Sequence, residues 1–191
     1  MNVSPAQFRT GLTETVAAIL RETAFPAHRL ELEITESILL KDIEANLRTL
    51  HVLKKLGIRI AIDDFGTGYS SLGNLRSFPF DKIKIDRSFV TDLEQSDDSA
   101  AIVHAILGLG HSLGIATCAE GVETKAQLAY LRREGCSEVQ GYYYSKPKPI
   151  SEVAAMLNRG PAQPASSLPV IRDEVPLAAE PMLGANVPET A

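Results

Sequence analysis

The sequence predicts an α/β protein in which repeated strand–helix units build a parallel sheet. Short apolar or alternating segments recur along the chain, and most are separated by one segment with helical periodicity. No tight two-residue hairpin turn joins consecutive strands, which favours parallel pairing. With 191 residues, 45% of them hydrophobic, the chain has room for one domain with a sizeable core.

The chain opens on the end of a strand, at residues 1–4, and then turns into a helix. Ser4, Pro5 and Gln7 combine an N-cap, a proline at the first helical position and a capping-box partner. The apolar face expected for the helix comprises Leu12, Val16, Ile19 and Leu20. The next strand is predicted at residues 30–36, where apolar and polar side chains alternate strictly. A helix over residues 43–53 follows, and Gly57 is placed to end it.

Residues 59–65 form an apolar strand pattern that ends in two adjacent acids, Asp63 and Asp64. Adjacent carboxylates repel one another unless a positive charge lies between them, and hard divalent cations prefer carboxylate oxygens. The stretch therefore predicts a cation site at a strand end. Gly66 and Gly68 follow at once. A Gly-x-Gly pair is weak evidence for phosphate binding and more often permits a tight turn, so we interpret it as a mobile loop.

The second half of the chain continues the strand–helix alternation. A strand at residues 82–86 places Ile83 and Ile85 on one side and the polar residues Lys82, Lys84 and Asp86 on the other. The remaining expected elements are a helix at 97–113 ended by Gly114, a strand at 115–119, a helix opened by the capping box of Thr124 and Gln127 and stopped at Gly135, a strand at 138–144, and a helix from Ser151 to Leu157.

The spacing of these six strands fits either an open doubly wound sheet or a barrel. Strands of a doubly wound sheet are apolar on both faces, whereas here charged residues lie within or at the ends of strands. A barrel gathers such inward polar groups at one mouth. We therefore predict a TIM-type (βα) barrel that is incomplete, with about six of its eight strands present.

Polar side chains stand near the C-terminal end of each predicted strand. They are Asn2, Glu33, Asp63, Asp64, Lys84, Asp86, Glu120 and Gln140. A single acid of this kind is most often a solvated loop residue, and Lys84 by itself could form a structural ion pair with Asp86. Because strand ends converge on one face of a barrel, the whole set predicts a shared site.

Composition restricts the class of protein. The net charge of −5 argues against a nucleic-acid polymer as partner, and no apolar run reaches the length of a membrane span. We expect a cytoplasmic protein with Cys118 and Cys136 as free thiols. Residues 160–191 are rich in proline, acidic and without apolar periodicity, which predicts a disordered tail.

Five segments closely resemble, in the same order, the motifs of the EAL-domain family: Glu33-Ile34-Thr35-Glu36-Ser37, Asp63 to Leu72, Lys84 to Val90, Ala119 to Thr124, and Gln140-Gly141-Tyr142. The family consists of bacterial phosphodiesterases that hydrolyse cyclic di-GMP to linear pGpG on a modified TIM barrel with two Mg²⁺ or Mn²⁺ ions. The resemblance implies that residues 1–159 are a partial EAL phosphodiesterase domain, with cyclic di-GMP as ligand.

By the same resemblance, Asn2, Glu33 and Asp63 are metal ligands, and Asp64 serves the second ion or bridges both. Lys84 contacts the attacking water, and Glu120 acts beside it as a catalytic residue. The supporting or substrate-contacting residues are Glu36, which braces the loop after Asp64, together with Asp86, Glu123 and Gln140. The resemblance also implies a homodimer and an upstream sensor or cyclase domain.

The sequence departs from the family in one respect. It begins at the family's Asn-x-Ser strand, and Glu-Ala-Leu occurs nowhere in it. The glutamate of that segment is a metal ligand in the family, so we expect impaired turnover in this truncated chain. Three interpretations remain open: a phosphodiesterase whose first part lies outside the sequence, a non-catalytic module that binds cyclic di-GMP or a partner protein, and a remnant without stable function.

Overall fold

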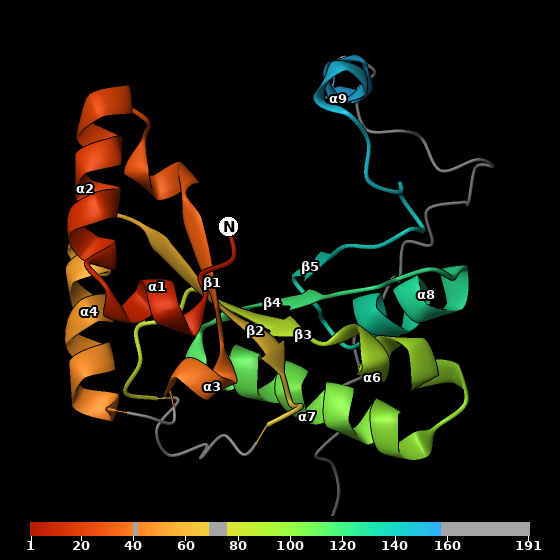
Figure 1. The fold of residues 1–191 in the computed structure, drawn as a ribbon. Coiled ribbons are helices and arrows are strands. Elements are labelled where there is room, and N and C mark those ends of the chain that lie inside the picture. Colours follow the sequence, from red (N-terminus) through yellow and green to blue (C-terminus); the bar gives the residue numbers. More distant parts are fainter. Residues whose placement is uncertain (40–41, 69–75, 158–191) are drawn as a thin grey trace, which may run out of the picture. The chain divides into compact units, whose positions relative to one another are not determined.

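The computed structural model describes residues 1–39, 42–68 and 76–157 (Figure 1). Residues 69–72 of the second motif and the predicted tail at 160–191 lie outside the described residues. The chain divides into two compact units, of which the first is Met1–Pro147. In the second unit the structure describes one helix, α9 (Ile150–Leu157), so Ser151 lies inside that helix instead of preceding it.

The first unit is built on one parallel sheet. Its strands are β1 (Glu31–Thr35), β2 (Arg59–Phe65), β3 (Lys82–Ile85), β4 (Ala116–Ala119) and β5 (Glu138–Val139). They lie side by side in chain order, β1-β2-β3-β4-β5, and every pair is parallel (Figure 1). A doubly wound sheet reverses its strand order at a switch point, whereas a barrel keeps chain order. The described sheet has no reversal, which confirms the α/β fold with an incomplete TIM-type barrel.

Two predicted strands are shorter in the structure. The first is an isolated parallel bridge between Asn2 and Glu33, in which Val3 N donates to Glu33 O at 2.9 Å. The last strand ends at Val139 instead of residue 144. The chain turns there because Gly141 passes against the backbone of Val122, where a Cβ atom would collide. The described residues therefore hold five strands and one bridge where we predicted six strands.

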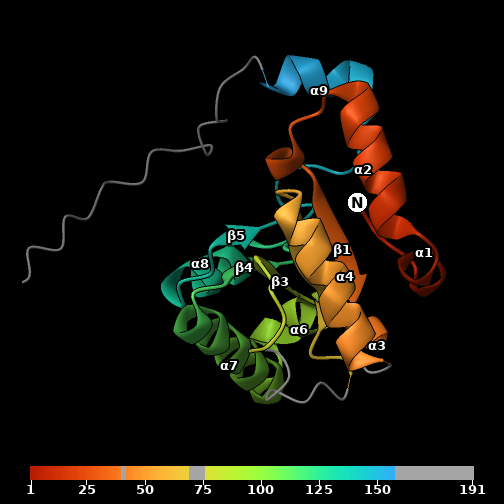
Figure 2. The same cartoon turned by 90° about the vertical axis from the view of Figure 1, so that its left-hand side faces the viewer.

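Helices line one side of the sheet of the first unit (Figure 2). They are α1 (Pro5–Arg9), α2 (Leu12–Thr23), α3 (Glu36–Leu39), α4 (Ile43–Lys55), α6 (Arg87–Thr91), α7 (Asp97–Leu113) and α8 (Lys125–Arg133), with 3₁₀ turns at Ala27–Arg29 and Asp92–Glu94. Both predicted capping boxes are confirmed, one at Ser4 with Gln7 and one at Thr124 with Gln127. Helix α7 has the predicted bounds and ends at Gly114, which adopts a φ of 67°.

The two faces of the central strands carry different chemistry. Ile83 and Ile85 of β3 are fully buried and belong to the same apolar cluster as Val103 and Ile106 of α7. The alternate residues of β3 are lysines, and they are buried as well. We call the face that carries these lysines the inner face. The predicted alternation at residues 82–86 is thus confirmed, and it separates an apolar outer face from a charged inner face.

Some predicted apolar positions lie on the surface. The helix expected from Pro5 through Leu20 is interrupted at Gly11, which has a φ of 62° and separates α1 from α2. Leu12 and Val16 are buried on α2, but Ile19 is 51% exposed. Cys118 and Cys136 are free thiols, as predicted; both were expected to be buried, but only Cys118 is, and Cys136 is partly exposed. Among the described residues, no helix combines the length and the apolar character that crossing a membrane requires.

Leu50 and Val52 offer a test of the outer face, because both lie on α4 and only one contributes to the core. Leu50 is fully buried and Val52 is 46% exposed. Leu50→Ala should lower the free energy of unfolding by about 2–5 kcal/mol, since it leaves a cavity. Val52→Ala should change it by less than about 0.5 kcal/mol. Urea unfolding measures both, and equal losses would contradict the assignment of the core.

Candidate functional site

The ammonium group of Lys84 lies at the centre of the inner face. Its Nζ atom donates to Glu33 Oε2 at 2.6 Å and to Asp63 Oδ1 at 2.8 Å, and lies 2.5 Å from Glu120 Oε1. These carboxylates come from β1, from β2 and from the residue after β4. Three strands therefore deliver their acids to one lysine on β3. The ion pair with Asp86 that Lys84 could have formed is not among these contacts.

The amide of Asn2 closes one side of this cluster. One terminal atom of its side-chain amide lies 3.2 Å from Glu33 Oε2 and 3.1 Å from Asp63 Oδ2. If this atom is the nitrogen, Asn2 donates to both carboxylates; if it is the oxygen, three oxygens converge on one point. The second arrangement is the one a cation stabilises. On the other side, Gln140 Nε2 donates to Glu120 Oε1 at 3.0 Å.

A bulge in β2 brings both adjacent aspartates to the site. Consecutive strand residues normally face opposite sides of a sheet. The register with β3 shifts between Ile62 and Phe65, and Asp64 adopts a φ of 52°, in the left-handed region. Such a bulge re-aims side chains next to a functional site. As a result, carboxylate oxygens of Asp63, Asp64 and Glu120 lie within 4.8 Å of one another.

Asp86 stands at the edge of the cluster and caps helix α6. Its Oδ1 atom accepts from Ser88 N at 2.9 Å and from Ser88 Oγ at 2.5 Å. Burial would raise the pKa of Asp86, but the hydrogen bonds from Ser88 outweigh it and lower the pKa below its ordinary value. Burial raises the pKa of Asp64, and the nearby charges of Asp63 and Asp86 raise it further. The two neighbouring acids are thus shifted in opposite directions.

Charge on Lys84 and Glu120 follows from the same contacts. Burial by itself would lower the pKa of Lys84, but hydrogen bonds to Asp63, Glu120 and Glu33 raise it well above its ordinary value. Burial raises the pKa of Glu120, and Lys84 offsets only part of this effect. Lys84 therefore remains an ammonium at neutral pH and acts as a hydrogen-bond donor.

The carboxylate of Glu36 contacts the two glycines that follow Asp64. Glu36 begins α3, is 5% exposed, and accepts from Gly66 N through Oε1 at 2.9 Å. Its other oxygen, Oε2, is buried without a hydrogen-bond partner among the described residues. A Cβ atom on Gly68 would collide with that oxygen. The absence of a side chain at Gly68 thus permits its close approach to Glu36, and the interpretation of the Gly-x-Gly pair as a mobile loop stays a prediction.

A pocket of about 390 Å³ adjoins the cluster at Glu120. The exposed Glu123 lies at its wall, and the backbone N of Glu123 donates to Gln127 Oε1 at 2.8 Å. The lining includes three residues that we did not predict: Arg87, Tyr142 and Lys146. Tyr142 is 53% exposed, and Lys146 Nζ lies 5.6 Å from its ring centroid. A signal for Tyr142 was present, because it belongs to the motif that contains Gln140.

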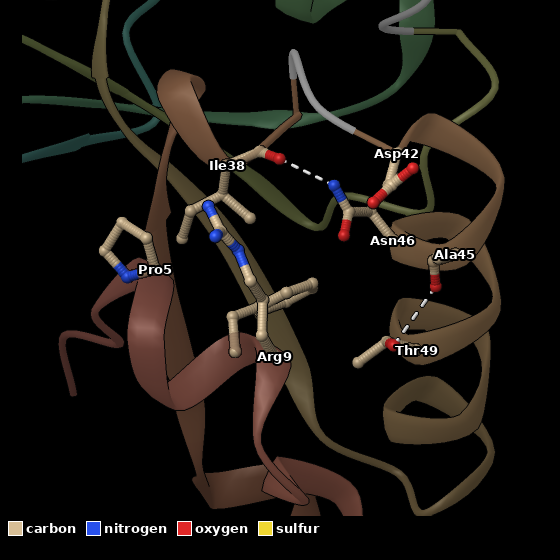
Figure 3. A pocket seen from close by; sticks show the side chains of 8 residues that line it. Pro5, Arg9, Ile38, Asp42, Ala45, Asn46 and Thr49 are labelled. Carbon is tan, nitrogen blue, oxygen red and sulfur yellow. Dashed lines mark hydrogen bonds between the residues drawn. The ribbon is translucent and has the colours of Figure 1, made fainter.

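The outer ring of helices holds a second pocket, of about 380 Å³, between α1, α3 and α4 (Figure 3). Two of its polar side chains bind the protein itself: Asn46 Nδ2 donates to Ile38 O at 2.6 Å, and Thr49 Oγ1 donates to Ala45 O at 3.1 Å. It shares no residue with the acidic cluster. The cluster on the inner face is therefore the stronger candidate site.

The donor set of the cluster fits divalent cations. Carboxylate and amide oxygens are the ligands that Mg²⁺, Mn²⁺ and Ca²⁺ prefer. With all acids ionised, five carboxylates outnumber the two ammonium groups at the cluster, which are Lys84 Nζ and the N-terminal amine of Met1, 3.8 Å from Glu33 Oε1. The carboxylates are those of Glu33, Asp63, Asp64, Asp86 and Glu120. Divalent cations would neutralise the excess negative charge. Asn2, Glu33, Asp63 and Asp64 could supply their ligands.

Comparison with known proteins gives one consistent result. The family model described as EAL domain matches residues 1–147. The bifunctional diguanylate cyclase/cyclic di-GMP phosphodiesterase MucR of Pseudomonas aeruginosa is 45% identical over 157 residues, which cover 81% of this chain and 23% of MucR. This chain spans about a fifth of the length of the curated relatives that it matches.

Solved structures agree with the sequence match. A PaMucR phosphodiesterase in complex with c-di-GMP superimposes with a TM-score of 0.77 at 43% identity, covering 80% of this chain and 62% of that one. A manganese/cy-diGMP complex of BlrP1 from Klebsiella pneumoniae gives a TM-score of 0.71 at 32% identity, covering 77% of this chain and 38% of that one. The chain therefore belongs to the EAL domain family.

Proposed function

We propose that this chain is a cyclic di-GMP phosphodiesterase domain that hydrolyses its substrate to linear pGpG with two divalent cations. The observation that carries the proposal is the cluster around Lys84, where three partly buried carboxylates share one buried ammonium beside a further pair of acids. Two related EAL proteins support it, because one was solved with c-di-GMP and another with manganese and cy-diGMP. The alternative is a non-catalytic module that binds cyclic di-GMP or a partner protein.

Two Mg²⁺ or Mn²⁺ ions would be held by Asn2, Glu33, Asp63 and Asp64. When bound, such ions polarise phosphoryl oxygens and make a nearby water more acidic. The convergence of the Asn2 amide with Glu33 and Asp63 supports one part of this ligand set. The short separation of Asp63, Asp64 and Glu120 supports the other part.

The hydrogen bonds of the remaining site residues indicate the roles that we propose for them. Lys84 donates to the attacking water or to a phosphoryl oxygen, since its raised pKa keeps it charged and excludes a role as general base at neutral pH. Glu120 accepts from that water while Gln140 orients its carboxylate. The residues with supporting roles are Glu36, which holds the Gly66 turn, Asp86, which faces Asp64, and Glu123, at the pocket wall.

The pocket beside Glu120 is suited to the nucleotide part of the substrate. Tyr142 offers an exposed ring on which a guanine base can stack. Arg87 and Lys146 bring positive charge that would attract the phosphates. The pocket meets the acidic cluster at Glu120 and Gln140, so a bound phosphodiester would extend toward the cations.

A sensor or cyclase domain as partner is also a proposal. It is supported by the greater length of the relatives and by the two activities in the name of MucR. A homodimer, a cytoplasmic location and a disordered tail at residues 160–191 stay predictions from the sequence.

Turnover is the direct test of the proposed activity. The 191-residue chain, incubated with cyclic di-GMP and Mn²⁺, should release pGpG, which chromatography resolves. We expect the rate to be low, because the sequence contains no Glu-Ala-Leu segment. Asp63→Asn should reduce the rate by more than about 100-fold, since it removes a ligand charge that Lys84 also contacts. Asp92→Asn, an exposed substitution in the 3₁₀ turn after α6, serves as the control.

The same experiment separates the two candidate functions. Calorimetric binding of cyclic di-GMP by the folded chain without any pGpG would favour the non-catalytic module. A folded chain that neither binds nor cleaves cyclic di-GMP in the presence of Mn²⁺ would contradict the phosphodiesterase and leave only a module that binds a partner protein.

The nucleotide pocket can be tested with two tyrosines of one segment. Tyr142→Ala should weaken binding of cyclic di-GMP by about tenfold, because stacking on an aromatic ring contributes about 1–3 kcal/mol per base. Tyr144 is similarly exposed but does not line the pocket, so Tyr144→Ala should leave the affinity unchanged. Isothermal titration gives both dissociation constants. Equal affinities of the two variants would rule out stacking on Tyr142.

Asp64→Asn should alter how stability depends on pH when divalent cations are absent. Because the pKa of Asp64 is raised in the folded state, the folded chain keeps its proton where the unfolded chain has released it. This group therefore lowers stability as pH rises from the ordinary carboxyl pKa to the raised one. In urea unfolding with a chelator, from about pH 4 to about pH 7, the variant should lose less stability than the wild type.

Addition of Mn²⁺ at neutral pH supplies the control for that experiment. The ion should stabilise the wild type more than Asp64→Asn, since it binds the folded state through a ligand that the variant lacks. Parallel pH curves for the two proteins would show that the pKa of Asp64 is not raised in the folded chain, and equal stabilisation by Mn²⁺ would show that Asp64 is not part of a cation site.

A further inference from the structure

A second group of charged side chains lies on the inner face, two residues before the acidic cluster along β1 and β3. Lys82 is 7% exposed, and its Nζ atom lies 3.0 Å from Glu31 Oε1 and 2.7 Å from Glu138 Oε2. The function proposed above uses none of these three residues. A buried lysine is costly unless its charge is paired, so the contacts must hold for the strand to stay in place.

The three residues connect the two ends of the described sheet. Glu31 is on β1, Lys82 on β3 and Glu138 on β5, so each acid stands two strands away from the lysine. Neighbouring strands are about 4.8 Å apart, which would place either acid about 10 Å from Lys82 in a flat sheet. The extended side chains of a lysine and a glutamate can together span that distance, and curvature of the sheet toward its inner face shortens it further. The bridge joins the first and last strands across the inner face.

Each residue of this bridge lies two positions before a residue of the acidic cluster. Glu31 precedes Glu33 on β1, and Lys82 precedes Lys84 on β3. Glu138 likewise stands on the strand that leads to Gln140. Two residues advance a strand by about 6–7 Å and return to the same face. A displacement of β1 or β5 at the bridge would therefore move Glu33 or Gln140 in the cluster.

We propose that Lys82 is a positioning residue: its bridge to Glu31 and Glu138 holds β1, which carries the metal ligand Glu33, and β5, which leads to the Glu120 partner Gln140, and thereby sets the affinity for divalent cations. The inference rests on the proposed metal site. It assigns no contact with substrate to Lys82, which acts on the cations only through the strands.

The surroundings of the bridge make its removal testable in a folded protein. Arg59 NH2 lies 3.6 Å from Glu31 Oε2, so Glu31 keeps a cation when Lys82 is replaced. The side chain of Glu138 is 46% exposed and can be solvated instead. Lys82→Met, which retains the length of the side chain but removes its charge, therefore leaves no isolated buried carboxylate.

A matched control is available in Lys54. Its Nζ atom pairs with Asp81 at 2.5 Å in a partly buried position, on α4 beside the start of β3. Asp81 precedes Lys82 in the chain, but among the described residues neither side chain of this pair forms a hydrogen bond or ion pair with the acidic cluster or with the bridge; the second oxygen of Asp81 accepts from Ile60 N at 2.8 Å. Lys54→Met thus removes a comparable ion pair without loosening β1 from β5.

The experiment measures Mn²⁺ binding by isothermal titration on the full 191-residue chain. Lys82→Met should bind Mn²⁺ about 10–100-fold more weakly than the wild type, the range expected when support for a metal ligand is lost. Lys54→Met should bind Mn²⁺ as the wild type does, even where both variants lower the melting temperature alike. Circular dichroism verifies that each variant is folded.

A folded Lys82→Met chain with wild-type Mn²⁺ affinity would overturn the inference and leave the proposed function intact. If Lys82→Met does not fold, Glu138→Gln replaces it, because this change cuts only the connection to β5; a severalfold loss of affinity supports the inference and an unchanged affinity overturns it. If the wild type and Asp63→Asn bind Mn²⁺ equally, the metal site itself is absent and the proposed function fails with the inference.

Discussion

The structure depends on one constraint, the burial of the Lys84 ammonium among carboxylates that come from different strands. A lysine that is 6% exposed needs its charge compensated, and Glu33, Asp63 and Glu120 provide the compensation. Because these acids are far apart in sequence, the contacts form only when β1, β2, β3 and β4 are aligned in the observed register. The site is therefore a consequence of the fold, and the charge balance of the site in turn favours that register.

The sheet can satisfy this constraint because its two faces are chemically separate. On β3 the isoleucines join the apolar cluster under the helices, while both lysines face inward. The inner face consequently carries two successive layers of ion pairs, centred on Lys82 and on Lys84. Most TIM-type barrels fill this space with branched apolar side chains. Here the electrostatic contacts replace that packing, so the geometry of the acids depends on charge pairing more than on volume.

Local patterns in the sequence predicted most of the strands, the longer helices and the polar residues of the cluster, although the N-terminal helix breaks at Gly11 and the short helices α3 and α6 were not predicted. Strict alternation at β1 and β3 predicted which side chains share a face, and the capping boxes at Ser4 and Thr124 predicted where helices begin. Three features could not be predicted in this way. The contact of Gly141 with Val122 shortens β5, the pocket around Tyr142 depends on that turn, and the bridge of Lys82 joins residues of three different strands. Each involves residues that are distant in sequence and that no periodicity relates.

The opposite pKa shifts of Asp64 and Asp86 indicate different roles for the two carboxylates in the proposed site. Asp86 is held ionised by the hydrogen bonds of Ser88, so its charge is a fixed part of the site. The backbone of Asp64 is strained in the left-handed region, and burial together with like charges raises the pKa of its side chain. Of the two, Asp64 gains more from a nearby cation, because the cation removes the repulsion that favours its protonated form. The backbone strain and the repulsion at Asp64 therefore destabilise the folded chain without cations, and they agree with the proposed cation site, where a bound cation would remove the repulsion.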